Sequence, residues 1–293
     1  MGTYLARLGE RTRSVGSVLC VGMDPVPDAL PAGFSRDLAG VECFCEVLLG
    51  ATLPYAAAVK PNLAFFEAFG AAGVAALERL RARVPAEVLF VGDAKRGDIG
   101  TTAARQAAAL FDILDCDAVT VNPYLGSEAV EPLLARSDRF AYVLCRTSNP
   151  GAGELQSLLV AGDAELGVPE EPLYARVARR ARTWGPGGTV GLVVGATAPL
   201  ELGQIRAIAP ELALLVPGVG AQGGEVEPVL RHGPASAPPA GEWPGGGLLV
   251  NVSRGITGAA SLPRATHGRP APDVAESLAA AAAEWAARLK VPV

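Results

Sequence analysis

Short apolar runs alternate with amphipathic stretches along almost the whole chain. Runs rich in Val, Leu, Ala and Ile predict eight strands, at 17–24, 56–62, 88–95, 118–124, 141–149, 189–197, 213–220 and 248–256. These runs do not alternate strictly with polar residues, which is typical of parallel strands buried on both faces. Helical spacing of the apolar residues predicts helices at 3–13, 37–50, 64–84, 102–112, 127–136, 170–183, 199–208, 225–231 and 273–289.

The order of these elements predicts the fold class. Eight strands, each followed by a helix, within 293 residues predict a single α/β domain over residues 1–293, a (β/α)8 TIM barrel. It would have an N-terminal helix and an extended loop after strand five, at 150–168. A doubly wound open sheet is the alternative, but no G-x-G-x-x-G follows the first strand to support it. The Pro- and Gly-rich stretch 233–247 precedes strand eight, so we expect it at the barrel end opposite the chemistry.

The stretch 88–102, VLFVGDAKRGDIGTT, concentrates charge at the end of the third apolar run. Side chains alternate faces along a strand, so Asp93 and Lys95 are expected to point the same way. Gly97 lets the chain turn, so Asp98 leaves the strand and can face something else. Charges on the inner face of a buried strand are unfavourable unless they are paired or used. The stretch is therefore the candidate active site.

Lysine is rare in this chain. Of 25 Lys and Arg residues only Lys60, Lys95 and Lys290 are lysine. Lys60 ends the second apolar run as Lys95 ends the third, whereas Lys290 is most simply a solvated residue near the C-terminus. A compact ammonium that can give up a proton is one reason for lysine at the first two positions. The alternative is an inward Lys–Asp pair kept for strand register, and we favour the functional interpretation.

In a barrel of this kind the chemistry gathers at the C-terminal ends of the strands. There the sequence places polar residues at Asp24, Lys60, Asn62, Asp93, Lys95, Asn122, Ser148, Asn149, Gln222 and Arg254. Asn62 and Asn122 are equally well explained as turn formers, whereas Asn251, inside strand eight, is less easily explained in this way.

Two glycine-bearing segments at 216–224 and 251–258 follow strands seven and eight, where many barrels hold a phosphate with backbone N–H groups. Gln222 can donate its amide to a phosphate, and Arg254 can bind two oxygens at once. We therefore predict a phosphate site formed by these two segments.

Composition excludes several classes of function. The net charge is −5, and no basic run is present, so we expect no nucleic-acid partner. The only two histidines, His232 and His267, lie in loops, and two inward lysines would repel a dication, so we expect no metal and no cofactor. Five cysteines without a C-x-x-C pair fit a reducing compartment. No signal sequence or apolar run of transmembrane length is evident, so we expect a cytoplasmic protein without a membrane partner.

Six motifs occur in order: VGMDP, VKPN, DAKRGDIGTT, RTSNPG, PGVGAQGG and NVSRG. In these motifs the chain resembles the orotidine 5′-phosphate decarboxylase family, most closely its longer bacterial branch, over nearly its whole length. The resemblance implies cofactor-free decarboxylation of orotidine 5′-phosphate to uridine 5′-phosphate (UMP) in pyrimidine biosynthesis. It also implies a homodimer whose active site is shared across the interface.

The same resemblance implies a role for each candidate residue. A charge array around the reacting carbon would consist of Lys60, Asp93, Lys95 and Asp98, with Lys95 as proton donor. Substrate would be bound by Asp24 at the ribose, Ser148 at the pyrimidine, Gln222 and Arg254 at the phosphate, and Asp98, Ile99 and Thr102 contributed by the neighbouring subunit. From their glycines and their position after strands, we expect the loop 217–224 to close over the bound phosphate as the main lid, with 149–168 as a second candidate.

Two other functions are compatible with part of the pattern. Barrels that act on keto-sugar phosphates share the D-x-K-x-x-D core, but they usually need a metal and carry an acid where this chain has Lys60. A catalytically silent nucleotide-binding barrel is the second alternative. It would have no reason to keep two inward lysines among so many arginines.

Overall fold

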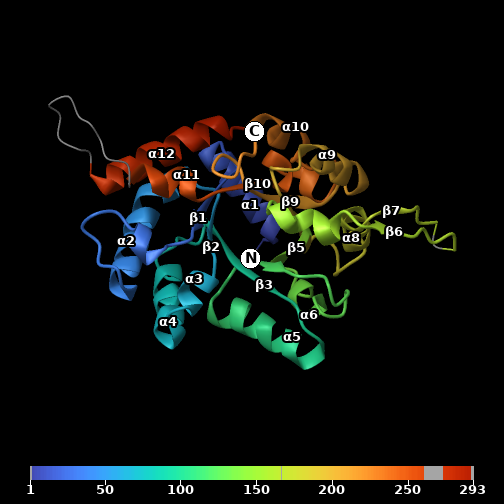
Figure 1. Ribbon diagram of the computed structural model, residues 1–293, viewed down its shortest axis with the longest axis horizontal. Coiled ribbons are helices and arrows are strands. Elements are labelled where there is room, and N and C mark those ends of the chain that lie inside the picture. The colour runs from blue at the N-terminus through green and yellow to red at the C-terminus, as the bar shows by residue number, and fades with distance from the viewer. Residues whose placement is uncertain (1, 166, 261–272, 292–293) are drawn as a thin grey trace.

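A computed structural model describes residues 2–165, 167–260 and 273–291. Within them, eight parallel strands close into a barrel in the order β1-β10-β9-β8-β5-β4-β3-β2, with β1 paired to both β2 and β10. The strands are β1 (Leu19–Met23), β2 (Ala58–Pro61), β3 (Leu89–Arg96), β4 (Ala118–Val121), β5 (Phe140–Arg146), β8 (Val190–Val194), β9 (Ala213–Pro217) and β10 (Leu249–Val252). Figure 1 shows helices surrounding these strands. The predicted (β/α)8 barrel is confirmed.

The helices follow the predicted order. They are α1 (Tyr4–Val15), α2 (Leu38–Thr52), α3 (Ala64–Glu67), α4 (Gly70–Arg81), α5 (Gly100–Ala107), α6 (Glu131–Leu134), α7 (Gly153–Gln156), α8 (Leu173–Ala181), α9 (Pro199–Ile208), α10 (Val226–His232), α11 (Arg254–Thr257) and α12 (Val274–Arg288). The prediction of one helix over 64–84 is wrong, because the chain breaks at Gly70, whose φ of 62° lies in the left-handed region that glycine adopts without strain. The helix predicted at 102–112 continues from α5 into a π-helical turn, η3 (Ala108–Ile113).

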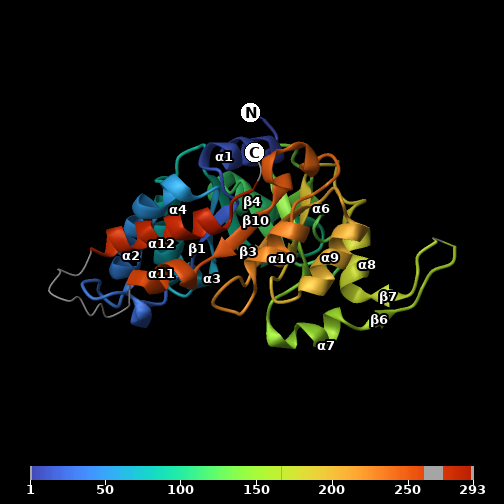
Figure 2. The same ribbon diagram turned by 90° about the horizontal axis from the view of Figure 1, so that it is seen from above.

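Helix α1 closes the N-terminal end of the barrel. The Tyr4 ring stacks on Phe140 inside the barrel, with ring centroids 4.6 Å apart, and its hydroxyl lies 3.1 Å from that of Tyr142. The segment 233–247 packs beside α1, where Trp243 lies against Gly9. Figure 2 shows α1 at one end of the barrel and α7 at the other, so this segment lies away from the C-terminal strand ends, as predicted.

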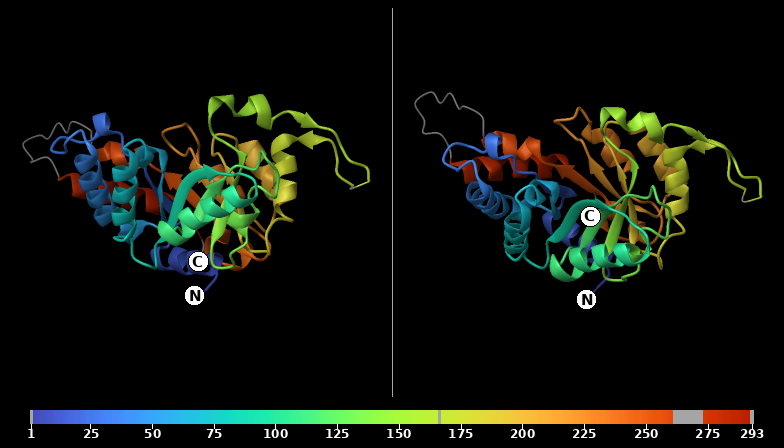
Figure 3. Two further views of the ribbon diagram at one scale, coloured as in Figure 1. Left: turned by 90° about the horizontal axis from the view of Figure 1, so that it is seen from below. Right: turned by 60° about the horizontal axis from the view of Figure 1, so that its bottom comes forward.

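The predicted extended loop after strand five is present, but it is not structureless. It contains α7 and an antiparallel pair of short strands, β6 (Leu159–Val160) and β7 (Glu171–Pro172), which project from the barrel (Figure 3). The base of this arm is fixed because the buried Glu171 carboxylate accepts hydrogen bonds from Arg176 and Arg179, both at 2.9 Å. Sequence periodicity missed β6 and β7 because two residues are too few to show a period.

One apolar helical segment corrects the sequence interpretation. The expectation that no run reaches transmembrane length is wrong for Leu38–Tyr55, an 18-residue segment with a mean hydropathy of 1.3. The segment is long and apolar enough to cross a membrane, judged by its length and composition alone. The core helix of a soluble protein can be equally long and apolar. Val41, Phe44 and Leu48 on α2 are buried in the same apolar cluster as the barrel's helix-facing residues, as expected of a core helix.

Candidate active site

The residues of β3 that face the barrel interior end at the charged cluster. Leu89 and Val91 belong to the cluster that fills the barrel interior, and Asp93 continues their period of two toward the strand's C-terminal end. Beyond Gly92 the register with β4 shifts, and Lys95 has a φ of 48°. A non-glycine residue in this left-handed region costs about 1–2 kcal/mol. Such strain is typical of positions that the surrounding structure holds for function.

A single carboxylate holds both candidate lysines. Asp93 accepts from Lys95 Nζ at 2.5 Å through Oδ1, and from Lys60 Nζ, on the neighbouring strand β2, at 2.7 Å through Oδ2. The Lys60 side chain is only 5% exposed, whereas that of Lys95 is 48% exposed at the barrel mouth. The structure thus brings together the two lysines singled out by their rarity. The inner ammonium is buried, and the outer one is half-exposed to solvent.

Burial and charge act in opposite directions on the pKa values in this cluster. Burial by itself raises the pKa of the Asp93 carboxyl, but the charges of Lys60 and Lys95 outweigh it and hold that pKa well below its usual range. Burial by itself lowers the pKa of Lys60, but the nearby charges of Asp93 and Asp24 raise it above its usual value. Asp93 is therefore a carboxylate and Lys60 an ammonium at neutral pH.

Two further oxygens at the barrel mouth have no hydrogen-bond partner among the described residues. They are Oδ1 of Asp24, just after β1, and Oδ1 of Asn251 on β10, which is 8% exposed. Buried acceptors of this kind are normally satisfied, so both could accept from a ligand's hydroxyl groups. The nearby Cys20 is not a nucleophile, because burial raises its thiol pKa to about 12.

The candidate ring and phosphate residues come from three other strand ends. Ser148 and Gln222 converge on Gly218, where an added Cβ would lie 3.0 Å from Ser148 Cβ and 2.9 Å from Gln222 Oε1. Gly218 has a φ of 95°, which also favours glycine. Arg254 begins α11 after β10 and lines, together with Asp24, a cavity of about 450 Å³. The loop after β5 thus meets the loop after β9, as a site for one ligand requires.

Asp98 does not join the charge cluster within one chain. Its carboxylate accepts from the Ile99 backbone N–H at 2.7 Å, and no ion pair to it is found among the described residues. Ile99 is 60% exposed, and Thr102 on α5 is exposed too. The predicted array of four charges is therefore three charges in a single subunit, with Asp98 turned to the segment that carries Ile99.

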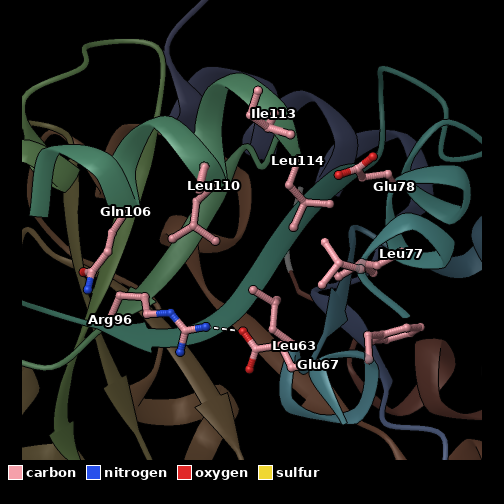
Figure 4. Close-up of a pocket in the computed structure, with 12 residues that line it drawn as sticks. Leu63, Glu67, Leu77, Glu78, Arg96, Gln106, Leu110, Ile113 and Leu114 are labelled. Carbon is pink, nitrogen blue, oxygen red and sulfur yellow. Dashed lines mark hydrogen bonds and ion pairs between the residues drawn. The ribbon is translucent and has the colours of Figure 1, made fainter. Parts of the chain in front are cut away.

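A second cavity lies on the outer side of β3, away from these residues. It has a volume of about 240 Å³, and most of its lining is apolar side chains from α3, α4, η3 and the residues next to them. Figure 4 shows Arg96 paired with Glu67, and Leu110, Leu114 and Leu77 among the apolar side chains that line the cavity. Arg96 follows Lys95 directly, and it also donates to the Ala94 carbonyl at 3.0 Å. This pair anchors the outer face of the strand that presents Lys95.

Sequence reasoning missed two polar side chains near the cluster. Thr120 on β4 contacts both Asp93 and Lys95, and Gln156 on α7 holds the residue before Ser148. Thr120 lies two residues beyond the inward-facing Ala118, so the strand period could have identified it.

The described part of the chain contains no cluster of metal-binding side chains. No group of three or more His, Cys, Asp or Glu side chains gathers there that could hold a metal ion. The prediction that His232 lies in a loop is wrong, because it is the last residue of α10; His267 lies outside the described residues. The metal-free site stays a prediction.

Comparison with known proteins gives consistent matches. Residues 17–268 match the model of the "Orotidine 5′-phosphate decarboxylase / HUMPS family". The orotidine 5′-phosphate decarboxylase of Roseiflexus castenholzii is 49% identical over 241 residues, covering 82% of this chain and 83% of the relative. That of Thermomicrobium roseum is 46% identical over 257 residues, covering 87% and 86%. The solved OMP decarboxylase of Leishmania donovani superposes with a TM-score of 0.78 at 39% identity, covering 97% of this chain and 95% of that one.

Proposed function

The chain belongs to the orotidine 5′-phosphate decarboxylase / HUMPS family, and from this we propose that it decarboxylates orotidine 5′-phosphate to UMP without a cofactor, with Lys95 as proton donor. The observation that carries the proposal is the pair of ammonium groups held by Asp93 at the barrel mouth. The activity would place the chain in pyrimidine biosynthesis. The curated relatives carry the decarboxylase name, which favours this activity over the keto-sugar-phosphate alternative.

The reaction breaks the bond between a ring carbon and its carboxyl group. The electron pair stays on that carbon, where no aligned π-system can absorb it, and carbon dioxide leaves. Lys95 supplies a positive charge beside this carbon and then transfers a proton from Nζ to it. An ammonium ~4 Å from a full negative charge, at an effective dielectric of about 20, stabilises it by ~4 kcal/mol. Asp93 holds the Lys95 ammonium in place through their contact at 2.5 Å, so the stabilisation needs no rearrangement.

Substrate binding would use the remaining strand ends. Asp24 accepts from the ribose hydroxyls with help from Lys60, and Ser148 hydrogen-bonds the pyrimidine ring. Gln222 and Arg254 hold the phosphate. Because the phosphate is remote from the reacting carbon, its binding energy can close the loop 217–224 over the site.

We further propose a homodimer in which Asp98, Ile99 and Thr102 complete the partner's site. The support within one chain is that Ile99 is an exposed apolar side chain and Asp98 does not pair with its own lysines. We keep residues 1–293 as one domain and a cytoplasmic location as parts of the same proposal.

The test is a spectrophotometric assay with orotidine 5′-phosphate in the presence of a chelator. Sustained loss of the substrate's ultraviolet absorbance is expected, and dependence on added metal would favour a keto-sugar-phosphate enzyme instead. Lys95→Ala should still bind UMP, but its kcat should fall by at least about 1,000-fold, since ~4 kcal/mol of electrostatic stabilisation is lost. Lys290→Ala, which removes an exposed lysine, is the control. Turnover by Lys95→Ala at the wild-type rate would remove Lys95 from its role.

A further inference from the structure

A threonine hydroxyl lies between Asp93 and Lys95 of β3. Thr120, on the neighbouring strand β4, is 2% exposed, and its Oγ1 donates to Asp93 Oδ1 at 2.9 Å. The same oxygen accepts from the backbone N–H of Lys95, also at 2.9 Å. A hydroxyl has one proton and two lone pairs, so it can make both bonds at once.

The bond to the Lys95 backbone replaces a lost strand contact. The regular pairing of β3 with β4 is interrupted between Gly92 and Arg96. Lys95 lies in this interruption with its left-handed backbone, and the Thr120 hydroxyl takes up its N–H. A backbone donor at such a place needs a partner, because an unpaired buried N–H is unfavourable. The side chain of Thr120 therefore holds the backbone conformation that aims Lys95 at Asp93.

The hydrogen bond from Thr120 to Asp93 fixes the carboxylate that accepts from the Lys95 ammonium. Oδ1 receives both the Lys95 ammonium and the Thr120 hydroxyl, while Oδ2 receives Lys60. With three donors arranged around it, the carboxylate plane has little freedom to rotate. The Lys95 ammonium is thus positioned at both ends, through its backbone and through its ion-pair partner.

We propose that Thr120 is a positioning residue for the proposed decarboxylation, setting the location of the Lys95 ammonium without touching the substrate. This inference rests on the proposed function for its kinetic consequence, but not for its geometric one. A residue that acts only by aiming the proton donor affects kcat, whereas KM is set by groups elsewhere at the barrel mouth.

The kinetic experiment compares Thr120→Val, which removes the hydroxyl at nearly constant volume, with Thr120→Ser, which keeps it. We expect Thr120→Val to lower kcat by roughly ten- to hundredfold, the range for a lost hydrogen bond to a charged group, with KM within about threefold. Thr120→Ser should restore kcat to within about threefold of wild type. Thr120→Ala serves as a second hydroxyl-free variant if the valine variant does not fold.

A matched control separates positioning from packing. Thr189 is 1% exposed, immediately precedes β8, and its Oγ1 has no hydrogen-bond partner among the described residues. Thr189→Val makes the same chemical change at the start of a barrel strand rather than at its C-terminal end. It should leave kcat unchanged.

Lysine labelling gives a readout that does not depend on activity. With only three lysines in the chain, ¹⁵N-lysine labelling gives three backbone amide signals, which Lys95→Arg and Lys290→Arg assign. Thr120→Val should shift the Lys95 amide signal and speed its hydrogen exchange, and it should leave that of Lys290 in place. Thr120→Ser should give the wild-type spectrum.

The inference is overturned by any of three results. These are wild-type kcat in Thr120→Val, equal loss of kcat in Thr120→Ser, or an unchanged Lys95 amide in Thr120→Val. If the wild-type protein does not turn over orotidine 5′-phosphate at all, the proposed function fails, but the amide signal still decides whether Thr120 holds Lys95.

Discussion

Replacing Asp93 by asparagine tests the claim that one carboxylate holds both ammonium groups. The substitution keeps the size of the side chain and one acceptor oxygen, but it removes the negative charge between Lys60 and Lys95. Because the Lys60 side chain is only 5% exposed, its charge would remain buried without its principal partner. We expect a loss of stability and of turnover together.

The size of the stability loss follows from the two ion pairs of Asp93, with Lys60 and with Lys95. The pair of Lys60 and Asp93, with charge centres ~4 Å apart at an effective dielectric of about 20, is worth ~4 kcal/mol. The Lys95 pair adds at most ~1 kcal/mol, because its side chain is 48% exposed and solvent screens it. The acceptor oxygen that asparagine keeps recovers ~1 kcal/mol. The net loss of ~4 kcal/mol agrees with the 3–5 kcal/mol typical of breaking a buried pair.

The dependence on pH has a defined sign. In the wild type the pKa of Lys60 is raised, so its contribution is fully present below its unfolded pKa and is lost as the pH rises through the folded pKa. The Asp93 pKa is depressed, so its contribution is present above its unfolded pKa and is lost as the pH falls through the folded value. In Asp93→Asn, burial acts on Lys60 without that carboxylate and lowers its pKa. The deficit of Asp93→Asn, meaning its loss of unfolding free energy relative to the wild type, should therefore shrink between pH 7 and pH 10 as Lys60 loses its proton.

Urea unfolding of both proteins at several pH values measures the deficit directly. Asp112→Asn is the control, since Asp112 pairs with Arg136 at 2.8 Å but is 50% exposed. That variant should lose far less stability than Asp93→Asn, because solvent screens its exposed pair, and the loss should show no trend between pH 7 and pH 10. A deficit in Asp93→Asn no larger than that of the control, or one that grows with pH, would refute the reasoning.

Two further outcomes are expected. Mixing inactive Lys95→Ala with inactive Asp98→Ala should restore activity, because a heterodimer would contain one intact shared site; no recovery despite verified subunit exchange would contradict the shared site. Gln156→Ala should raise KM about tenfold with little change in kcat, because Gln156 accepts from the Thr147 N–H at 2.9 Å, donates to its hydroxyl at 2.8 Å and so holds the loop that carries Ser148. Steady-state kinetics measures KM and kcat, and an unchanged KM would show that the loop is held without the two hydrogen bonds of Gln156.

The strands were predictable because burial on both faces makes each one a nearly continuous apolar run. The residues at which the strands end were less predictable. The eighth run was predicted at 248–256, but β10 ends at Val252, since the residues beyond it leave the ladder to form α11. Helix breaks depend on single backbone angles, such as that of Gly70, and hydrophobic periodicity does not report them.

Three of the four predicted members of the charged cluster, Lys60, Asp93 and Lys95, meet in this chain, but the geometry of the cluster was not predictable. Strand alternation correctly put Asp93 and Lys95 on one side, and the rarity of lysine identified Lys60. Alternation assumes an extended backbone throughout, however, and Lys95 instead adopts a left-handed conformation within an interrupted ladder. That interruption depends on the neighbouring strand, where Thr120 supplies the hydroxyl, so no property of the segment 88–102 alone could predict it.

The same reasoning explains why Asp98 differs from Asp93 although both lie in one motif. Asp93 faces inward because it still pairs on its other side with Asn62, just beyond β2, and so keeps the strand's period of two, which determines its direction. Asp98 follows the irregular turn at Lys95, and its backbone N–H bonds to Ala129, ahead of α6, instead of to a strand. Its direction is therefore set by the loop and not by the barrel. If the site needs a second carboxylate beside Lys95, the described residues of one chain place none there, and a second copy of the chain is the source that we propose.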